Sequence, residues 1–441
     1  MIIRHTPGRI LLLLSDCFIL FGSLYLALAL RTFALPEPSI FISFLLPFSL
    51  IILVSVSIFY SYGLYDKPSL SLIRDLSKRI FTSQILAAIS AVILFYILPT
   101  LGIAPKTVLI LYVLISTLLI NIWRNYAFSI VLRYKKQKSI IIGSGETFRT
   151  LVDELTRNPH TGITLISTID VDTYDMTKLI DVLKTTKPNS VIVDMRDERI
   201  KPYFGHFYSE VFAGSAVIDI VDVYEDIFDM VPLPIINQEW VFRYVSVSYR
   251  YNGFKRFIDL VITIPAYIFS LLFYPFIYMA IKLEDKGPIF FVHNRVGKHG
   301  KIIPIYKFRT MENKKTNEKN ETKKITKVGA FLRKTRLDEI PQLLNVIRGD
   351  ISLIGPRPEA PSLVEEYSKN IPFYNIRHVV RPGISGWAQV QQHEVPKFGI
   401  DIEQTSTKLS YDLYYLEHSS LLLDLAIILR TLKVLISKSG V

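Results

Sequence analysis

Cysteine is almost absent from this 441-residue sequence, which contains only Cys17. A single cysteine can form no intramolecular disulfide, and it cannot build a cysteine-based metal site. Acidic residues are too few to balance the basic ones, because 39 Asp and Glu face 51 Lys and Arg, a formal charge of +12. This charge suits anionic lipid headgroups, phosphate-bearing substrates or nucleic acid, and by itself it does not choose among them.

A complete glycine-rich dinucleotide fingerprint is also missing. The turn Gly143-Ser144-Gly145 resembles the start of one, but Phe148 occupies the third glycine position. This absence argues against one enzyme class with a similar layout, a membrane-bound NAD-dependent nucleotide-sugar dehydratase or epimerase. We therefore interpret the turn as part of a folded α/β module in which it serves packing.

Long apolar runs dominate the first third of the sequence, and half of all residues are hydrophobic. Four runs are each close to the roughly 20 residues that span a bilayer: 10–30, 41–60, 80–98 and 108–130. We predict four transmembrane helices in a domain that covers residues 1–134. The first run lacks a small-residue cleavage site and precedes three more, so we expect it to be retained.

Basic residues flank these runs unevenly. They gather before the first run, between the second and third, and after the fourth: Arg4, Arg9, Lys67, Arg74, Lys78, Arg79, Arg133, Lys135, Lys136 and Lys138. The opposite connections carry only Arg31 and Lys106. By the positive-inside rule, we predict a multi-pass protein of the cytoplasmic membrane whose soluble domains face the cytoplasm.

Residues 139–238 have a different pattern, in which short β-branched runs alternate with amphipathic segments. The runs are 140–142, 163–169, 191–194 and 217–221. This alternation predicts a small parallel sheet with helices between its strands, a Rossmann-like α/β domain.

A fifth apolar segment, 257–281, differs from the first four because it contains Pro265 and Pro275. Prolines bend helices, and here basic residues flank both ends. These residues are Lys255, Arg256, Lys282, Lys286, Arg295 and Lys298. We predict a kinked re-entrant helix whose ends lie on one side of the membrane; the alternative is a fifth, kinked transmembrane helix.

The stretch 295–336 contains fourteen Lys or Arg and three acidic residues, which makes it an environment for anions. Its polar part, 312–322, predicts a mobile loop. Apolar residues then recur at helical spacing from 340 to 347, so we expect a helix to start near Asp338 with Pro341 in its first turn.

Asp338 and Glu339 are predicted at the N-terminus of that helix, where free amide groups and the helix dipole favour phosphate. Asp338 by itself could be a plain helix N-cap. The basic context favours chemistry, because one of two adjacent carboxylates can attack phosphorus while the other holds a metal or a proton. Flanking cations together with a divalent ion are expected to keep both ionised and to screen the incoming diphosphate. Rigid Pro and Gly turns further on present Arg357 and Arg381, which suits phosphate recognition.

Taken together, these segments resemble the bacterial sugar transferase family, the monotopic phosphoglycosyl transferases that begin glycan assembly on undecaprenyl phosphate. The resemblance covers residues 255–432, and the regions before it resemble the long-form members. The motifs that carry it stand in order: Lys255-Arg256 with Asp259, Gly287-Pro288, Arg295-Val296-Gly297, Lys307-Phe308-Arg309-Thr310-Met311, Leu337-Asp338-Glu339-Ile340-Pro341-Gln342, Gly355-Pro356-Arg357-Pro358 and Pro382-Gly383-Ile384-Ser385-Gly386-Trp387.

The resemblance implies a C-terminal α/β catalytic domain, residues 250–441, anchored by the re-entrant helix. It implies that Asp338 attacks the β-phosphate of a UDP-sugar, that UMP leaves, and that polyprenyl phosphate takes up the covalent sugar phosphate. Glu339 would be a Mg²⁺ ligand or a proton acceptor. Substrate phosphates are expected at five cations: Lys307, Arg309, Arg333, Arg357 and Arg381.

The partners that the resemblance implies are the UDP-sugar, polyprenyl phosphate and membrane lipid, with Mg²⁺ as cofactor and no nucleic acid. A homodimer is compatible with it. The products served would be exopolysaccharide, capsule or O-antigen. An inactive scaffold of a glycan assembly complex is a further alternative, against which the intact Asp338-Glu339 pair argues.

The sequence departs from the family pattern in three places. The family's bend falls near the place of Leu272, so prolines at 265 and 275 predict a displaced bend. Arg336 stands where a small residue commonly precedes the Leu-Asp-Glu run. After Val390, the sequence continues Gln391-Gln392-His393 instead of Asn-Gly-Arg.

Overall fold

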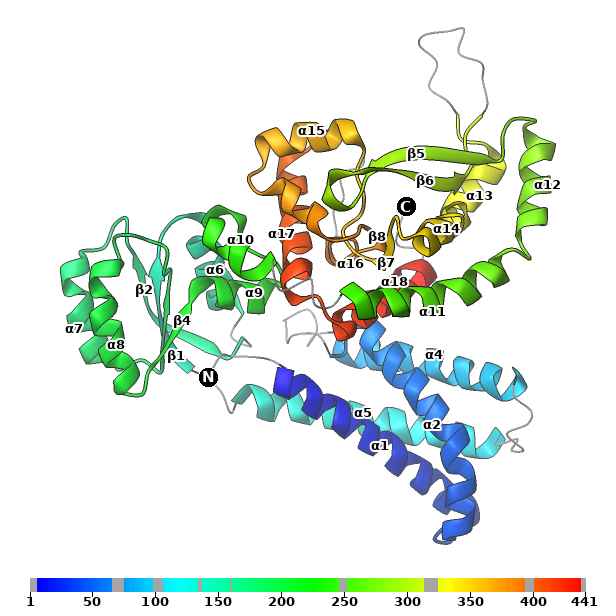
Figure 1. Ribbon diagram of the computed structural model, residues 1–441. Coiled ribbons are helices and arrows are strands. Elements are labelled where there is room, and N and C mark those ends of the chain that lie inside the picture. Colours follow the sequence, from blue (N-terminus) through cyan, green and yellow to red (C-terminus); the bar gives the residue numbers. More distant parts are fainter. Residues whose placement is uncertain are drawn as a thin grey trace. The chain divides into compact units, whose positions relative to one another are not determined.

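The computed structural model describes residues 6–65, 75–97, 106–133, 137–158, 161–245, 252–312, 324–392 and 400–437 (Figure 1). The chain divides into two compact units, Met1–Ile235 and Ile236–Val441. The predicted mobile loop beyond Glu312 and the family departure at His393 lie outside the described residues.

Four apolar helices open the first unit: α1 (Thr6–Thr32), α2 (Pro38–Ser61), α4 (Leu76–Ile97) and α5 (Lys106–Arg133). Each contains a segment that is long and apolar enough to cross a membrane, which confirms the four predicted helices. Leu24, Phe48 and Ile120 are fully buried in a shared core. Many other apolar side chains of these helices point outward, as lipid-facing side chains do.

An ion pair lies inside this bundle. Asp16 of α1 and Arg124 of α5 have no exposed surface, and Tyr65 donates a hydrogen bond of 2.8 Å to Asp16. Arg124 Nη1 also donates to the backbone oxygen of Leu64, 2.7 Å away, just after α2. Charged groups are tolerated in such a place only when they are paired, and this cluster joins three segments of the bundle.

A four-stranded parallel sheet follows, in the order β2-β1-β3-β4. The strands are β1 (Gln137–Gly143), β2 (Ile163–Asp170), β3 (Ser190–Val193) and β4 (Ala216–Asp219). Helices α6 (Gly145–Arg157) and α9 (Ile220–Phe228) pack on one face, and α7 (Leu179–Thr186) and α8 (Phe204–Phe212) on the other. The predicted small parallel α/β sheet is confirmed, because β-branched strands buried on both faces need helices on each side.

The second unit begins with α10 (Gln238–Val245) and a pair of helices, α11 (Asn252–Ser270) and α12 (Tyr274–Glu284), bent by 54°. Pro265 lies inside α11, which continues past it, whereas Pro275 lies in the first turn of α12. The break therefore falls at residues 271–273, and the expected displacement of the bend away from Leu272 is wrong. Pro275 fits the start of a helix, where its missing N–H costs no hydrogen bond.

Helix α11 buries its polar side chains and exposes its apolar ones. Thr263 and Asp259 are buried, while Phe257, Val261 and Ile268 are more than half exposed. Asp259 accepts hydrogen bonds from Ser352 Oγ and from the backbone N–H of Leu353. Arg256 also anchors the helix, because it donates to the backbone oxygens of Val346 and Ile347. A helix of this kind suits a lipid environment on its outer side.

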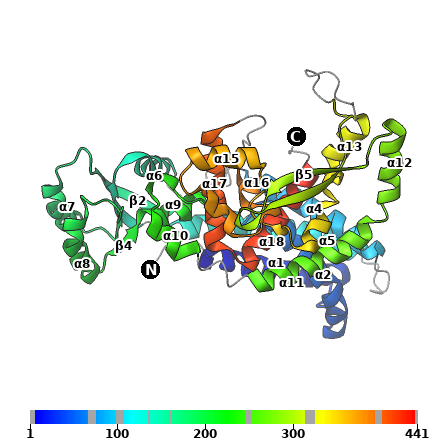
Figure 2. The same cartoon turned by 45° about the horizontal axis from the view of Figure 1, so that its top comes forward.

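The rest of the second unit combines short sheets with helices. An antiparallel hairpin, β5 (Phe290–Val296) and β6 (Ile302–Phe308), and a short parallel pair, β7 (Ser352–Ile354) and β8 (Gly383–Ser385), make up its described strands. Its remaining α-helices are α13 (Lys327–Thr335), α14 (Gln342–Arg348), α15 (Pro361–Asn370), α16 (Trp387–Gln391), α17 (Ile402–His418) and α18 (Leu421–Ser437). Figure 2 shows α15 beside β5 and α17.

Two glycine turns of the second unit cross in close contact. A Cβ added to Gly383 would lie 2.1 Å from the backbone nitrogen of Gly355, and one added to Gly355 would lie 2.5 Å from the backbone oxygen of Arg381. Side chains cannot be accommodated at such distances. Glycine at these positions therefore allows the turn at 355–358 to meet strand β8.

Candidate active site

The carboxylate pair lies in a 3₁₀ turn, Leu337–Glu339, that follows α13. Arg336 enters it with a left-handed backbone, φ 54°, and Pro341 is the N-cap of α14. The predicted helix start near Asp338 is therefore wrong by four residues, because a 3₁₀ turn precedes the first α-helical residue, Gln342. Asp338 is not the N-cap of either element, so plain capping does not explain it.

Two cations converge on Glu339. Its Oε1 accepts a hydrogen bond from Lys307 Nζ at 2.7 Å and one from Arg357 Nη2 at 3.0 Å. Lys307 comes from β6 and Arg357 from the turn after β7, so three separate segments meet at one oxygen. Burial by itself raises the pKa of Glu339, but Arg357 and Lys307 outweigh it and lower the pKa to about 2.

Asp338 is buried, with 8% of its surface exposed. Burial raises its pKa, and the neighbouring charge of Glu339 raises it further, while Lys307 and Arg333 act in the opposite direction. The sequence-based expectation that cations hold both carboxyl groups in the charged form is met for Glu339. For Asp338 the desolvation of the carboxylate outweighs the nearby cations.

The other predicted phosphate-binding cations are distributed more widely. Arg333 lies near Asp338 and donates from Nε to Thr310 Oγ1 at 2.9 Å. Arg309 is buried, and its Nη2 donates to the backbone oxygen of Asp285 at 2.8 Å. Arg381 donates to the backbone oxygen of Gly349 at 3.1 Å, at the C-terminal end of α14. Lys307 and Arg357 are thus the two that contact Glu339 directly.

Arg295 of β5 belongs to this site, although the sequence did not single it out. Burial lowers its pKa, the neighbouring Arg357 lowers it further, and its interaction with Glu339 opposes these effects. The next residue, Val296, donates its backbone N–H to the backbone oxygen of Glu359 at 2.9 Å, so Arg295 lies beside the segment that carries Arg357. Its place in the Arg295-Val296-Gly297 motif was the signal that could have identified it.

A buried charge network contacts the backbone of Arg357. Arg377 is 2% exposed, donates to Asp412 at 2.7 Å, and donates to the backbone oxygen of Arg357 at 3.0 Å. Glu359, two residues after Arg357, is paired with both Arg377 and Lys408. These contacts fix the backbone of the arginine-bearing turn, because a buried charge network holds only when all its members are paired.

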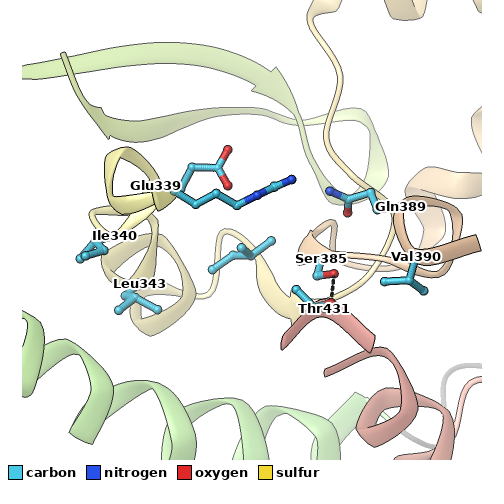
Figure 3. Close-up of a pocket in the computed structure, with 9 residues that line it drawn as sticks. Glu339, Ile340, Leu343, Ser385, Gln389, Val390 and Thr431 are labelled. Atoms are coloured by element: carbon cyan, nitrogen blue, oxygen red, sulfur yellow. Dashed lines mark hydrogen bonds between the residues drawn. The ribbon is translucent and has the colours of Figure 1, made fainter. Parts of the chain in front are cut away.

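A pocket of about 230 Å³ adjoins Glu339 (Figure 3). Ile340, Leu343 and Val390 contribute apolar walls, and Ser385 and Thr431 lie opposite Glu339, joined to each other by a hydrogen bond of 2.6 Å. The site therefore combines a charged part, at the carboxylate pair, with an apolar part next to it.

The donor atoms of this site fit Mg²⁺. This ion is commonly bound through one or two carboxylates together with substrate phosphates. Lys307 and Arg357 both engage Oε1 of Glu339, and within the described ranges no hydrogen bond reaches its Oε2. Glu339 can therefore offer one oxygen to a metal while the other retains its cationic partners.

The carboxyl edge of the α/β sheet has a different character. Arg199 pairs with Asp172 and Asp197 at 2.7 Å each, and its Nη2 donates to Ser144 Oγ in the glycine turn. Arg196 donates to both carboxylate oxygens of Asp219. These ion pairs occupy the edge where a dinucleotide would bind in a Rossmann fold, which gives no support to the NAD-dependent alternative.

Residues 250–438 match the family model described as bacterial sugar transferase, and residues 60–202 match one described as a CoA-binding domain. A UDP-N-acetylgalactosamine-undecaprenyl-phosphate N-acetylgalactosaminephosphotransferase of Aeromonas hydrophila is 36% identical over 267 residues, which are 58% of this chain and 61% of that protein. The match thus leaves more than a third of that relative uncovered.

Two further relatives carry names of related activities. An undecaprenyl-phosphate galactose phosphotransferase of Salmonella typhimurium is 29% identical over 69% of both chains. A UDP-glucose:undecaprenyl-phosphate glucose-1-phosphate transferase of Caulobacter vibrioides is 38% identical over 42% of this chain and 70% of that protein. The chain belongs to the bacterial sugar transferase family.

Proposed function

We propose that this protein transfers a hexose 1-phosphate from a UDP-sugar to undecaprenyl phosphate and releases UMP. The observation that carries the proposal is the buried Asp338 beside Glu339, which Lys307 and Arg357 hold in its charged form. The names of the three relatives support the lipid acceptor, and they differ in the sugar. The proposal therefore specifies a hexose and does not name which one.

The reaction proceeds in two displacements. A carboxylate oxygen of Asp338 attacks the β-phosphorus of the UDP-sugar, and the bond from that phosphorus to the bridging oxygen breaks, so UMP leaves with the electron pair. A phosphate oxygen of the lipid then attacks the same phosphorus. The bond to Asp338 breaks, the carboxylate is restored, and the lipid diphosphate sugar departs. Dividing the transfer in this way replaces one difficult step by two easier ones.

The cations around the pair bind and orient the phosphates. Lys307 and Arg357 contact Glu339, Arg295 interacts electrostatically with Arg357 and Glu339, and Arg333 does so with Asp338. Positive groups arranged before the reaction stabilise the charge that develops on the transferring phosphoryl group. Mg²⁺ held by Glu339 would add charge neutralisation for the diphosphate.

The four apolar helices and the apolar outer side of α11 support a membrane location for this reaction. We propose the cytoplasmic membrane, with both soluble regions on the cytoplasmic side, because Lys and Arg gather in the segments assigned to that face. A cytoplasmic site is also where nucleotide sugars are found. Glycans such as exopolysaccharide, capsule or O-antigen are the products that this first step would serve.

The test is a trapping experiment with UDP-sugars in the absence of lipid. We expect one equivalent of UMP at most, and a sugar phosphate attached to Asp338 in the peptide map. Asp338→Asn keeps the side-chain shape and should yield neither adduct nor turnover. A variant without this carboxylate that still turned over at the wild-type rate would falsify the covalent mechanism.

A further inference from the structure

The apolar pocket next to Glu339 is not needed to bind the donor diphosphate. Its volume of about 230 Å³ is below the roughly 300–1,000 Å³ of pockets that enclose a drug-sized ligand, so it cannot take up a complete nucleotide sugar. At most a part of a larger substrate fits inside it.

The wall of the pocket favours an apolar occupant. Four aliphatic residues contribute to it: Ile340, Leu343, Ile384 and Val390. The hydroxyl groups of Ser385 and Thr431 are bonded to each other, so these hydroxyls do not require a ligand. A sugar ring or a uracil would leave several of its own polar groups unpaired against such a wall, which costs free energy.

The pocket is built on elements that adjoin the lipid-facing helix. Leu343 belongs to α14, and Arg256 of α11 donates to the backbone oxygens of Val346 and Ile347 in the same helix. In Figure 3 the green ribbon below the pocket is α11. Thr431 comes from α18, which exposes Leu422 and other apolar side chains near its N-terminus. An apolar chain from a bilayer thus reaches the pocket along surfaces that already suit lipid.

Arg336 supplies the charge at the edge of this pocket. It lines the pocket together with Glu339, and it ends α13 in the left-handed conformation that is common at the C-termini of helices. A guanidinium group here is complementary to a phosphate attached to an apolar chain.

We propose that this pocket binds the first isoprene units of the lipid acceptor and that Arg336 binds the acceptor's phosphate. The inference rests on the proposed function, because it assigns the second substrate of that reaction to a position. It also accounts for the presence of Arg336 where the family pattern has a small residue. The lipid phosphate would then lie next to the carboxylate pair, where its oxygen must attack.

The experiment compares two variants, Arg336→Gln at the rim and Ile384→Trp in the wall, with Ile302→Trp as a matched control. Ile302 is 54% exposed on β6 and is not part of the pocket. The dissociation constant for undecaprenyl phosphate is measured in nanodiscs, together with the KM for the UDP-sugar. We expect lipid affinity to fall about tenfold or more in both pocket variants, while the donor KM stays within about twofold.

Different results would overturn different claims. Unchanged lipid affinity in Arg336→Gln would refute the pocket assignment even if Ile384→Trp failed to fold. A raised donor KM or an altered preference among UDP-sugars would assign the pocket to the sugar; Gln389 Oε1, which has no hydrogen-bond partner within the described part of the chain, could then accept a sugar hydroxyl. If the wild type bound the lipid in an Arg336-dependent manner but never transferred sugar phosphate, the proposed function would fail and the pocket would stand.

Discussion

Arginines and carboxylates lie next to a glycine turn in two regions of this molecule. Only one of these two regions has an excess of positive charge. At the edge of the α/β sheet, Arg196 and Arg199 are each paired with aspartates. At the carboxylate pair, one oxygen of Glu339 receives both Lys307 and Arg357. In the first arrangement the aspartates outnumber the two arginines, so no positive charge is left over. In the second, four cations outnumber the two carboxyl groups, which leaves positive potential for an incoming phosphate. Residue types alone do not distinguish them.

The two turns also differ in packing. A Cβ at Gly145 would meet nothing within 4 Å, although its φ is +76°. A Cβ at Gly383 would meet the backbone of the crossing turn at 2.1 Å. Gly145 of the α/β region permits a positive φ angle. Gly383 of the second unit permits two backbone segments of the same chain to come into contact. Catalytic geometry needs the second kind, because it fixes the position of Arg357.

Among the changes that test this comparison, the largest expected effect comes from Glu339→Gln. Removing the charge leaves Lys307 and Arg357 without their partner and takes away the oxygen available to Mg²⁺. We expect kcat to fall by about 100- to 1,000-fold, measured as UMP release at saturating UDP-sugar. The matched change in the other region, Asp197→Asn, should alter kcat by less than about twofold. Equal effects of the two changes would contradict the comparison.

The next effect concerns the arginines. Arg357→Ala should lower kcat/KM for the UDP-sugar by about 100-fold, because a charge-assisted contact in the site is lost. Arg199→Ala removes an arginine that has more side-chain partners than Arg357, namely Asp172, Asp197 and Ser144, and it should leave kcat/KM within about twofold. A strong effect of Arg199→Ala on donor kinetics would show that the α/β edge takes part in substrate binding.

Packing gives a third test. Gly383→Ala should destabilise the protein by at least about 2 kcal/mol, because the crossing turns must separate. Gly205→Ala in α8, where an added Cβ meets nothing within 4 Å, should be neutral or stabilise by up to about 1 kcal/mol. Thermal unfolding in one detergent measures both. A Gly383→Ala protein as stable as the wild type would show that the turns can move apart freely.

The smallest expected effect is that of Arg196→Lys. A lysine cannot reproduce the two hydrogen bonds to Asp219, of 2.8 and 2.9 Å, so about 0.5–1.5 kcal/mol of stability should be lost. UMP release should be unchanged. Loss of activity in this variant, with little loss of stability, would mean that the internal ion pairs of the α/β edge serve catalysis.

Periodic features of the fold were predictable from the sequence. The four apolar runs and the β-branched strands follow from composition and spacing, which depend on local residues. The start of α14 was not predictable, because a left-handed Arg336 and a 3₁₀ turn are decided by packing. The bend at residues 271–273 likewise falls outside the prolines. Tertiary contacts override propensity at such places.

For the site, the sequence identified the carboxylates and the cations but not their pairing. Lys307 and Arg357 were predicted and do meet at Glu339. Arg309 and Arg381 donate to backbone oxygens, and Arg309 also pairs with Asp285, so their role in phosphate binding stays a prediction. Arg377 was missed, since its action on Arg357 passes through a backbone oxygen. Which cations face the same oxygen depends on how distant segments cross.

The ion pair of Asp16 and Arg124 has a consequence for biogenesis. The two residues are 108 positions apart, in the first and last helices of the bundle. Both residues lie inside the membrane spans Leu11–Thr32 and Thr107–Tyr126, toward one end of each, and a charge within a span costs free energy when it has no partner. We therefore expect the nascent bundle to remain loosely assembled until the last helix leaves the ribosome, and chains truncated before Arg124 to be degraded faster than chains that include it. Pulse-chase measurements on the two lengths would follow this dependence.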